Sequence, residues 1–364
     1  MTGFACLARR RVPAELPFRF LDTILNYLAS SLAPLPLRRG AWKPSRKIAR
    51  WDAPGVLQKT GNLGEGFMIP MMNIYDTIRT SLHFNKFVVG ELLFVEYKCP
   101  IEQEVAGVWT PMDCFVHVLS GKKTWRTTDG TLTAEKGQTL FFKKGAAVVY
   151  QDFKDDFCVM DFFVSDNFIR DVVREVSGQL RGRPAGDAFQ KAAILVNGDV
   201  TLSAYFQSML AYFTGTAKPA ETLLTLKLKE LIVSILLGGK NPELAGYFQS
   251  LLKSDAPVLS QIMEANFSYN LALEDFARLS HRSLSTFKRD FRKYYNQSPG
   301  KWLLQKRLDY SAVLLKNPAF NVSRVALDCG FEDLSHFSRA FKGKFGTSPA
   351  NYRKGNSRSR LLAG

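Results

Sequence analysis

A pattern of aromatic and basic residues occurs twice near the C-terminus, over residues 286–302 and 336–352, at an offset of fifty positions. The aromatic positions of the two copies pair as Phe287 with Phe337, Phe291 with Phe341, Tyr295 with Phe345, and Trp302 with Tyr352. The residues between them are basic or small. Each copy therefore predicts an amphipathic helix with one buried and one presented face.

A shorter helical pattern precedes each copy, at residues 273–279 and 322–328. A tight turn separates the two helices in each case. Gly330 supplies the backbone freedom that the second turn needs, whereas the first turn has Ser280-His281-Arg282. The sequence therefore predicts two helix-turn-helix units in tandem.

Residues 301–316, between the units, carry leucine and valine at roughly helical spacing and predict a rigid connecting helix. Asn317-Pro318 ends it, because proline disfavours helical geometry in the residue before it. A fixed connector holds two recognition helices at a defined separation, and one turn of B-DNA measures about 34 Å. One chain is therefore expected to read two successive major grooves.

Residues 256–354 resemble the DNA-binding domain of the AraC/XylS family of bacterial transcription regulators. The resemblance is carried by the second unit, in Gly330-Phe331, residues 337–342, residues 345–349 and Tyr352-Arg353. It implies a transcription regulator of bacterial promoters, more often an activator, that binds double-stranded DNA and contacts RNA polymerase.

Helix geometry and this resemblance together nominate the DNA-contacting side chains. The candidates for base contact are Ser285, Lys288 and Arg289 in the first unit, and Leu334, Ser335, Ser338 and Arg339 in the second. Arginine can bond guanine through two acceptors, serine can serve base or phosphate, and leucine offers a thymine methyl only apolar contact. The candidates for phosphate contact are Arg292, Lys293, Lys342, Lys344 and Arg353.

The two arginines also have a simpler interpretation. They can be solvated, or paired with acids such as Asp290 or Glu332. Charge favours the nucleic-acid interpretation, since residues 256–354 hold sixteen basic and eight acidic residues, whereas residues 66–255 hold twenty and twenty-one. The basic excess is local, as expected for a phosphate-binding surface.

Residues 1–65 hold eleven basic and four acidic residues and six prolines, and they predict a disordered extension. Their apolar stretch is too interrupted for a membrane helix and lacks the features of a secretion signal, so a cytoplasmic protein is expected. An alternative is that translation begins at Met71 or Met72.

Short β-rich runs separated by turn signals fill residues 66–165. They lie at 87–97, 113–119, 123–127, 137–142, 147–150 and 157–163. Such spacing predicts a small barrel or sandwich, and the order of strands and turns resembles the cupin-like regulatory domain of many AraC-type proteins.

Cupins can be metalloenzymes, but the sequence does not favour catalysis, a metal or a cofactor. Histidine occurs only at positions 83, 117, 281 and 336, without the clustered His-x-His of catalytic cupins, and the five cysteines show no Cys-x-x-Cys spacing. His117, among apolar neighbours, is interpreted as structural. Glu91, Glu96 and Asp161 could line the barrel mouth, although surface or paired carboxylates are more frequent.

Residues 166–253 switch to helical patterns, at 167–180, 202–213 and 222–237. The last has more leucine than one buried face requires, which indicates either a homodimer contact or packing within the chain. Residues 156–170 are similar to the branch of the family that controls type III secretion, in which a protein partner can replace a small effector.

The expected fold class is therefore an α+β multidomain protein, with a cupin-like β-barrel or sandwich, a helical linker or dimerisation region, and an all-α tandem helix-turn-helix domain. Residues 355–364 are expected to be a disordered tail. The expected function is sequence-specific transcription regulation controlled by an effector or protein partner. The alternatives are a general nucleic-acid-binding interaction protein and a cupin enzyme fused to a DNA-binding module.

Overall fold

The computed structural model describes residues 69–98, 104–150, 157–180, 191–253, 258–317 and 320–361, with side chains as far as residue 355. All of them belong to one compact unit, residues 61–364. The extension predicted over residues 1–65 lies outside the described ranges. Within those ranges, no helix combines the length and the apolar character needed to cross a membrane.

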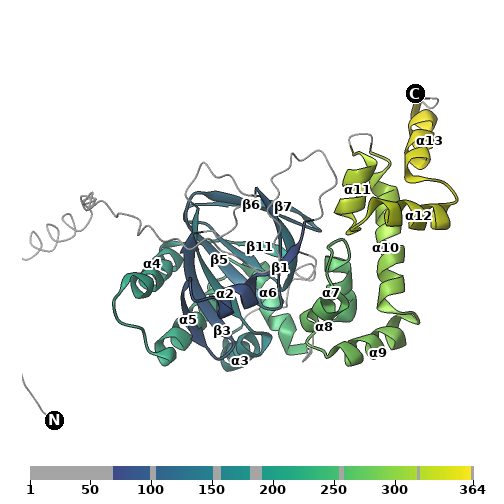
Figure 1. Ribbon diagram of the computed structural model, residues 1–364. Coiled ribbons are helices and arrows are strands. Elements are labelled where there is room, and N and C mark those ends of the chain that lie inside the picture. Colours follow the sequence, from purple (N-terminus) through teal and green to yellow (C-terminus); the bar gives the residue numbers. More distant parts are fainter. Residues whose placement is uncertain are drawn as a thin grey trace, which may run out of the picture. The chain divides into compact units, whose positions relative to one another are not determined.

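Two sheets form the N-terminal part of this unit (Figure 1). The first sheet contains, in spatial order, β1 (Met71–Asn73), β4 (Val105–Thr110), β9 (Gly145–Tyr150), β6 (Lys122–Thr127) and β7 (Gly130–Glu135). The second contains β11 (Ala193–Val196), β8 (Thr139–Phe142), β5 (Asp113–Ser120), β10 (Cys158–Val164), β3 (Leu92–Lys98) and β2 (Asn85–Val89). Neighbouring strands are antiparallel except β1 and β4, which are parallel.

The central strand β10 is buried on both faces, and alternate residues enter different cores. Val159 and Phe163 face the core between the two sheets, whereas Met160 and Phe162 face the helices. Side chains alternate across a strand, so a strand covered on both sides reads as a continuous apolar run. This is why the sequence predicted β5 and β10 well.

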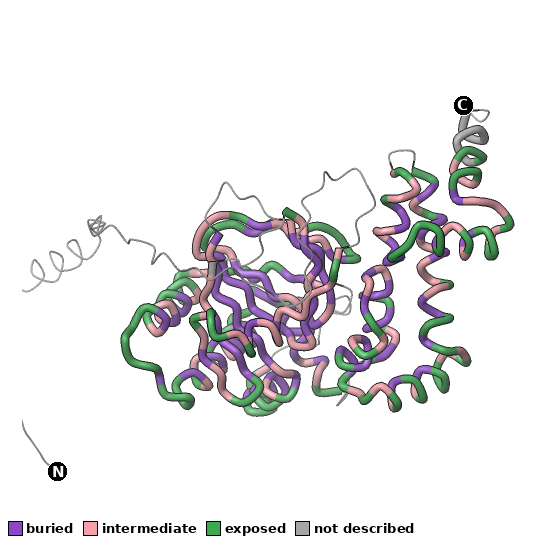
Figure 2. The backbone as a smooth tube through the Cα atoms, viewed as in Figure 1, coloured by how far each residue is buried: buried purple, intermediate pink, exposed green. Residues whose placement is uncertain are grey.

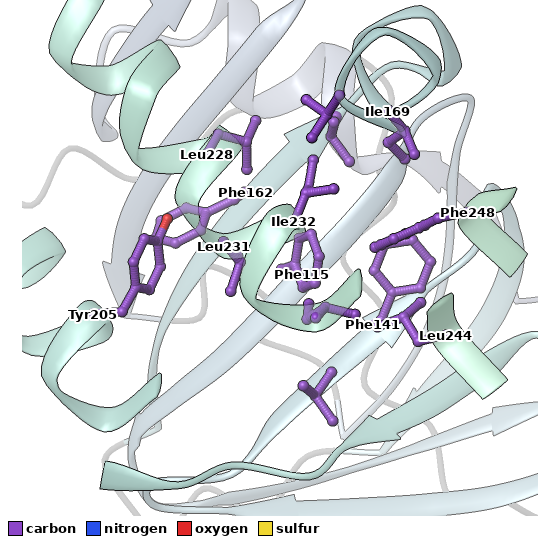
Figure 3. Close-up of a cluster of buried hydrophobic side chains, with 14 of the residues drawn as sticks. Phe115, Phe141, Phe162, Ile169, Tyr205, Leu228, Leu231, Ile232, Leu244 and Phe248 are labelled. Carbon is purple, nitrogen blue, oxygen red and sulfur yellow. The ribbon is translucent and has the colours of Figure 1, made fainter. Parts of the chain in front are cut away.

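Helices cover the outer face of the second sheet (Figure 3). They are α3 (Asp166–Val176), α4 (Val200–Thr214), α5 (Glu221–Leu237) and α6 (Pro242–Ser250), with the 3-10 turns η1 (Ser177–Gln179) and η2 (Leu251–Lys253); α2 (Ile74–Thr80) lies apart from them, between β1 and β2 in sequence. Phe115 and Phe162 of the sheet pack against Leu228 and Ile232 of α5 and Phe248 of α6. Most of the leucine surplus in α5 is therefore explained by packing within the chain.

The C-terminal part is helical. It contains α7 (Leu259–Asn266), α8 (Leu273–Leu279), α9 (Leu284–Tyr295), α10 (Pro299–Leu314), α11 (Val322–Asp328), α12 (Leu334–Phe345) and α13 (Pro349–Leu361). The expected fold class is confirmed: a β-sandwich is followed by two helix-turn-helix units, α8–α9 and α11–α12, on either side of α10. Residues 355–361, expected in a disordered tail, continue α13, because the sequence has no proline there to end it.

The connecting helix α10 belongs to the cores of both units. Buried segments recur along its length (Figure 2). Trp302 and Leu303, near its start, pack with Phe287 and Phe291 of α9. Leu308 and Ala312, further along, pack with the phenylalanines of α12. Because one continuous helix is buried in both cores, the two units have a fixed mutual orientation.

Candidate DNA-binding interface

The first recognition helix, α9, buries one face and presents the other. Ser283 caps its N-terminus by accepting a hydrogen bond from the Thr286 backbone N–H at 3.2 Å. Phe287 and Phe291, four residues apart, are fully buried. The opposite face carries exposed Ser285, Lys288, Arg289, Arg292 and Lys293. The helix therefore brings the predicted contacts of the first unit together.

The second recognition helix, α12, repeats this arrangement. The Asp333 carboxylate caps it, accepting from the backbone N–H groups of Ser335 and His336 at 2.9 Å each. Phe337 and Phe341 are buried. Of the predicted base contacts, Leu334, Ser335 and Arg339 are exposed and Ser338 is half-buried.

Arg289 lies beside an acid, as the alternative interpretation anticipated. Its Nη2 is 3.3 Å from Asp290 Oδ1, and the Arg289 side chain is 74% exposed. Asp290 also accepts from Arg282 Nε at 3.3 Å. An exposed pair of this kind contributes little, so a nucleic acid can replace it at small cost.

Two of the predicted phosphate contacts have partners within the protein that sequence reasoning missed. Lys344 Nζ lies 2.7 Å from Asp309 Oδ1 on α10, and half-buried Arg353 donates to the Phe320 carbonyl at 3.0 Å. The other candidates, Arg292, Lys293 and Lys342, are exposed.

The two helix-turn-helix turns place different residues at the same backbone position. His281 and Gly330 each follow the C-cap of the first helix of their unit, with φ of 54° and 77°. These positions are 49 residues apart, rather than fifty, because the second turn is one residue longer. In the first unit a residue other than glycine adopts the left-handed conformation, which is unfavourable in free energy.

Gly330→Ala is expected to destabilise the protein by about 2 kcal/mol, because left-handed geometry is costly for alanine. The added Cβ would also lie 2.8 Å from the Ser268 carbonyl oxygen. Urea unfolding followed by circular dichroism measures the change. His281→Gly is the matched substitution at the equivalent position and is expected to be neutral or slightly stabilising. Equal destabilisation by both would contradict this account.

Arg307, on α10, joins two segments through three of their backbone carbonyls. Its guanidinium donates to Phe267 O at 2.7 Å, Tyr269 O at 2.7 Å and Gly330 O at 3.0 Å. Burial lowers the Arg307 pKa to about 10. This residue was not predicted from the sequence, where its only signal is a single arginine within a leucine-rich connector. The Arg307 clamp ties the α7–α8 loop to the turn of the second unit.

The β-sandwich contacts the helical part through several polar groups. The buried Asn266 side chain, at the end of α7, accepts from the Ala146 backbone N–H at 2.8 Å. Arg126 Nη2 lies 3.0 Å from Asp328 Oδ1, and Arg278 Nη2 lies 2.7 Å from Asp76 Oδ2. These contacts connect the sandwich with both helix-turn-helix units.

A cavity of about 290 Å³ is lined by inward-facing residues of both sheets, including Val116 and Phe163 from the second sheet and Trp125 from the first. Ile262 and Asn266 of α7 line it as well. Of the three carboxylates considered in the sequence, Asp161 lines this cavity, whereas Glu91 is exposed and Glu96 is half-buried.

His117 contacts Thr139 and Phe206 within the described part of the chain. Its Nδ1 is 2.9 Å from Thr139 Oγ1, its ring stacks on Phe206, and burial lowers its pKa to about 4. The described side chains include no group of three or more His, Cys, Asp or Glu residues able to hold a metal ion.

Two protein families match the chain. Residues 113–247 match the family described as ExsA N-terminal regulatory domain, and residues 276–355 match the family described as Helix-turn-helix domain. The first match lies within the β-sandwich and its helices, and the second covers both recognition helices.

Curated relatives match across both parts. The "Virulence regulon transcriptional activator VirF" of Yersinia enterocolitica is 24% identical over 72% of this chain and 96% of its own. The "HTH-type transcriptional regulator ExsA" of Pseudomonas aeruginosa is 25% identical over 67% of this chain and 86% of its own.

Among solved structures, an apo form of ToxT from Vibrio cholerae covers 72% of this chain and 96% of its own, with 14% identity and a TM-score of 0.35. The DNA-binding domain of AdpA, solved in complex with a target DNA, covers 27% of this chain and 87% of its own, with 31% identity and a TM-score of 0.25.

Proposed function

The chain belongs to the AraC/XylS family of bacterial DNA-binding transcription regulators, and we propose that it activates promoters at which α9 and α12 read successive major grooves. The observation that carries this proposal is the pair of exposed recognition faces held by one helix, α10, that is buried in both cores. The local charge of +8 over residues 256–354 supports binding to the DNA backbone.

Recovery of genomic fragments by the purified full chain, in competition with random DNA at about 0.15 M salt, tests sequence-specific reading. We expect a shared motif with two blocks about 10 base pairs apart, since that spacing places successive major grooves on one face of the duplex. Binding without a motif would instead favour a general nucleic-acid-binding protein.

Activation is supported by the relative from Yersinia enterocolitica, whose name describes a transcriptional activator. We infer a contact with RNA polymerase at the promoter. Run-off transcription with purified polymerase on the recovered fragments is expected to increase on addition of the protein. A decrease would identify a repressor.

Control by an effector or a regulatory protein is proposed for the β-sandwich. The cavity supports it, because residues of both sheets and of α7 line the same space. An occupant would therefore contact the helix from which the DNA-binding part begins. In this proposal the occupant, or a protein bound to the sandwich, changes the affinity for DNA through α7.

We also propose that the protein forms a homodimer in the cytoplasm. On α5, Leu223 and Leu226 remain 46% and 53% exposed although neighbouring leucines are buried. Sedimentation equilibrium of the full chain tests the assembly, and a monomer at micromolar concentration would assign these leucines to the surface of a single chain.

A further inference from the structure

The cavity in the β-sandwich contains an acid at a position where the strand pattern places apolar residues. Along β10, Val159, Asp161 and Phe163 share one face and all line the cavity. Asp161 is only 5% exposed. An acid among apolar neighbours at such a position requires a partner, because a buried unpaired polar group is unfavourable.

One carboxylate oxygen of Asp161 has a partner and the other does not. The Tyr97 hydroxyl donates to Oδ2 at 2.7 Å. Oδ1 is shielded from solvent and makes no hydrogen bond to the described residues. Burial raises the Asp161 pKa to about 7, so the carboxylate predominates above that pH.

Of the five lysines that line the cavity, Lys253 is exposed to solvent and the other four have contacts within the protein. Lys144 pairs with buried Asp113 and Asp166, and Lys143 lies over the Tyr247 ring at 4.5 Å. Lys123 lies over the Phe157 ring at 4.3 Å, and its charge acts to lower the Asp161 pKa against the larger effect of burial. Lys191 pairs with Glu243 at 2.8 Å. Among the buried polar side-chain atoms of the described lining, Asp161 Oδ1 is therefore the one without a hydrogen bond.

We propose that this cavity binds a small, uncharged, mostly apolar molecule whose single N–H or O–H group donates to Asp161 Oδ1. The lining contains charged groups of both signs, so a charged molecule of either sign would meet at least one group of like charge. The volume of about 290 Å³ is at the lower end of the range for small-molecule pockets. The inference rests on the proposed effector control and specifies the class of effector.

Indole and benzofuran are the matched probes, because their shapes are nearly the same but only indole has an N–H. Calorimetric titration of the full chain at pH 8, without DNA, is expected to show indole binding at least about tenfold more tightly, as a hydrogen bond to a charged acceptor provides. Equal affinities, or no binding of either, would overturn the proposal, and so would tighter binding of decanoate than of indole.

Asp161→Asn provides a second test with an expected reversal. The amide oxygen can accept from Tyr97 while Nδ2 presents a donor to the cavity, so the preference should shift toward benzofuran, which offers an oxygen acceptor. The control is Asp171→Asn, on an exposed surface of α3, which should keep the preference for indole. An unchanged preference in Asp161→Asn would contradict the assignment; if this variant does not fold, the wild-type comparison still decides.

DNA binding measured without either probe separates this inference from the proposed function. If the chain selects its DNA motif but binds neither probe, the ligand assignment fails and the regulator remains. If indole binds as expected but no motif is recovered, the ligand site stands and the promoter-reading proposal fails.

Discussion

Substituting Arg289 or Arg339 with alanine is expected to weaken binding to the selected DNA site by about 1–3 kcal/mol, because each arginine can form two hydrogen bonds with a guanine. Each loss should be confined to one base position. Arg289→Ala should relax the preference in the block read by α9, and Arg339→Ala in the block read by α12. Fluorescence anisotropy with a set of singly substituted duplexes measures both effects.

The control for this prediction is Lys342→Ala. Lys342 is exposed in the last turn of α12, where a phosphate contact is expected, so its loss should weaken all sequences alike and reduce the dependence of affinity on salt. Lys344 is less suitable, because its ion pair with Asp309 also supports α10. Equal losses on specific and random DNA for both arginine variants would exclude base contact by these residues.

Several helices were predicted closely because their signals are local. The expected helices at 273–279 and 322–328 coincide with α8 and α11, and the expected helix at 222–237 differs from α5 by one residue. Each has apolar residues at helical spacing and a turn directly after it. The repeated aromatic positions also identified which face of α9 and α12 is buried.

The sandwich was predicted less completely because some of its strands depend on distant partners. The run at 87–97 is two strands, β2 and β3, because Gly90 adopts φ of 58° and forms a turn that the apolar residues on either side concealed. Strand β4 was missed. It contains Gly107, where a Cβ would lie 2.8 Å from the Pro70 carbonyl oxygen, so this glycine permits a close approach by the chain leading into β1.

In the candidate site, too, features set by nearby residues were predictable and features set by distant residues were not. The recognition faces follow from periodicity, whereas the Arg307 clamp depends on carbonyl groups 23 to 40 residues away in sequence. Backbone acceptors have no residue type of their own, so no motif indicates them. Asp161 was noticed as a cavity candidate, but its unpaired oxygen becomes evident only when every neighbouring side chain has been placed.

Arg307→Lys is expected to weaken the coupling between the two DNA-reading units, although α10, buried in both cores, would still connect them. Lysine keeps the positive charge, but one ammonium group on a flexible chain cannot reproduce the planar fork that reaches three carbonyls. We expect a loss of about 1–3 kcal/mol in the free energy of unfolding, because buried carbonyls lose their donors. Affinity for a site with both blocks should fall at least about tenfold. Once one unit is bound, a less rigid connection lowers the effective concentration of the other unit at its own block.

Block spacing distinguishes this positioning role from a general loss of stability. Adding one base pair between the blocks displaces the second by about 3.4 Å along the duplex, which a rigid pair of units should reject. Wild type should therefore discriminate between the two spacings, and Arg307→Lys should discriminate less. Lys306→Ala is the matched control, because its exposed pair with Glu264 also joins α10 to α7 but contributes little. A variant that loses stability but keeps the full spacing preference would show that Arg307 supports folding without setting the register of DNA reading.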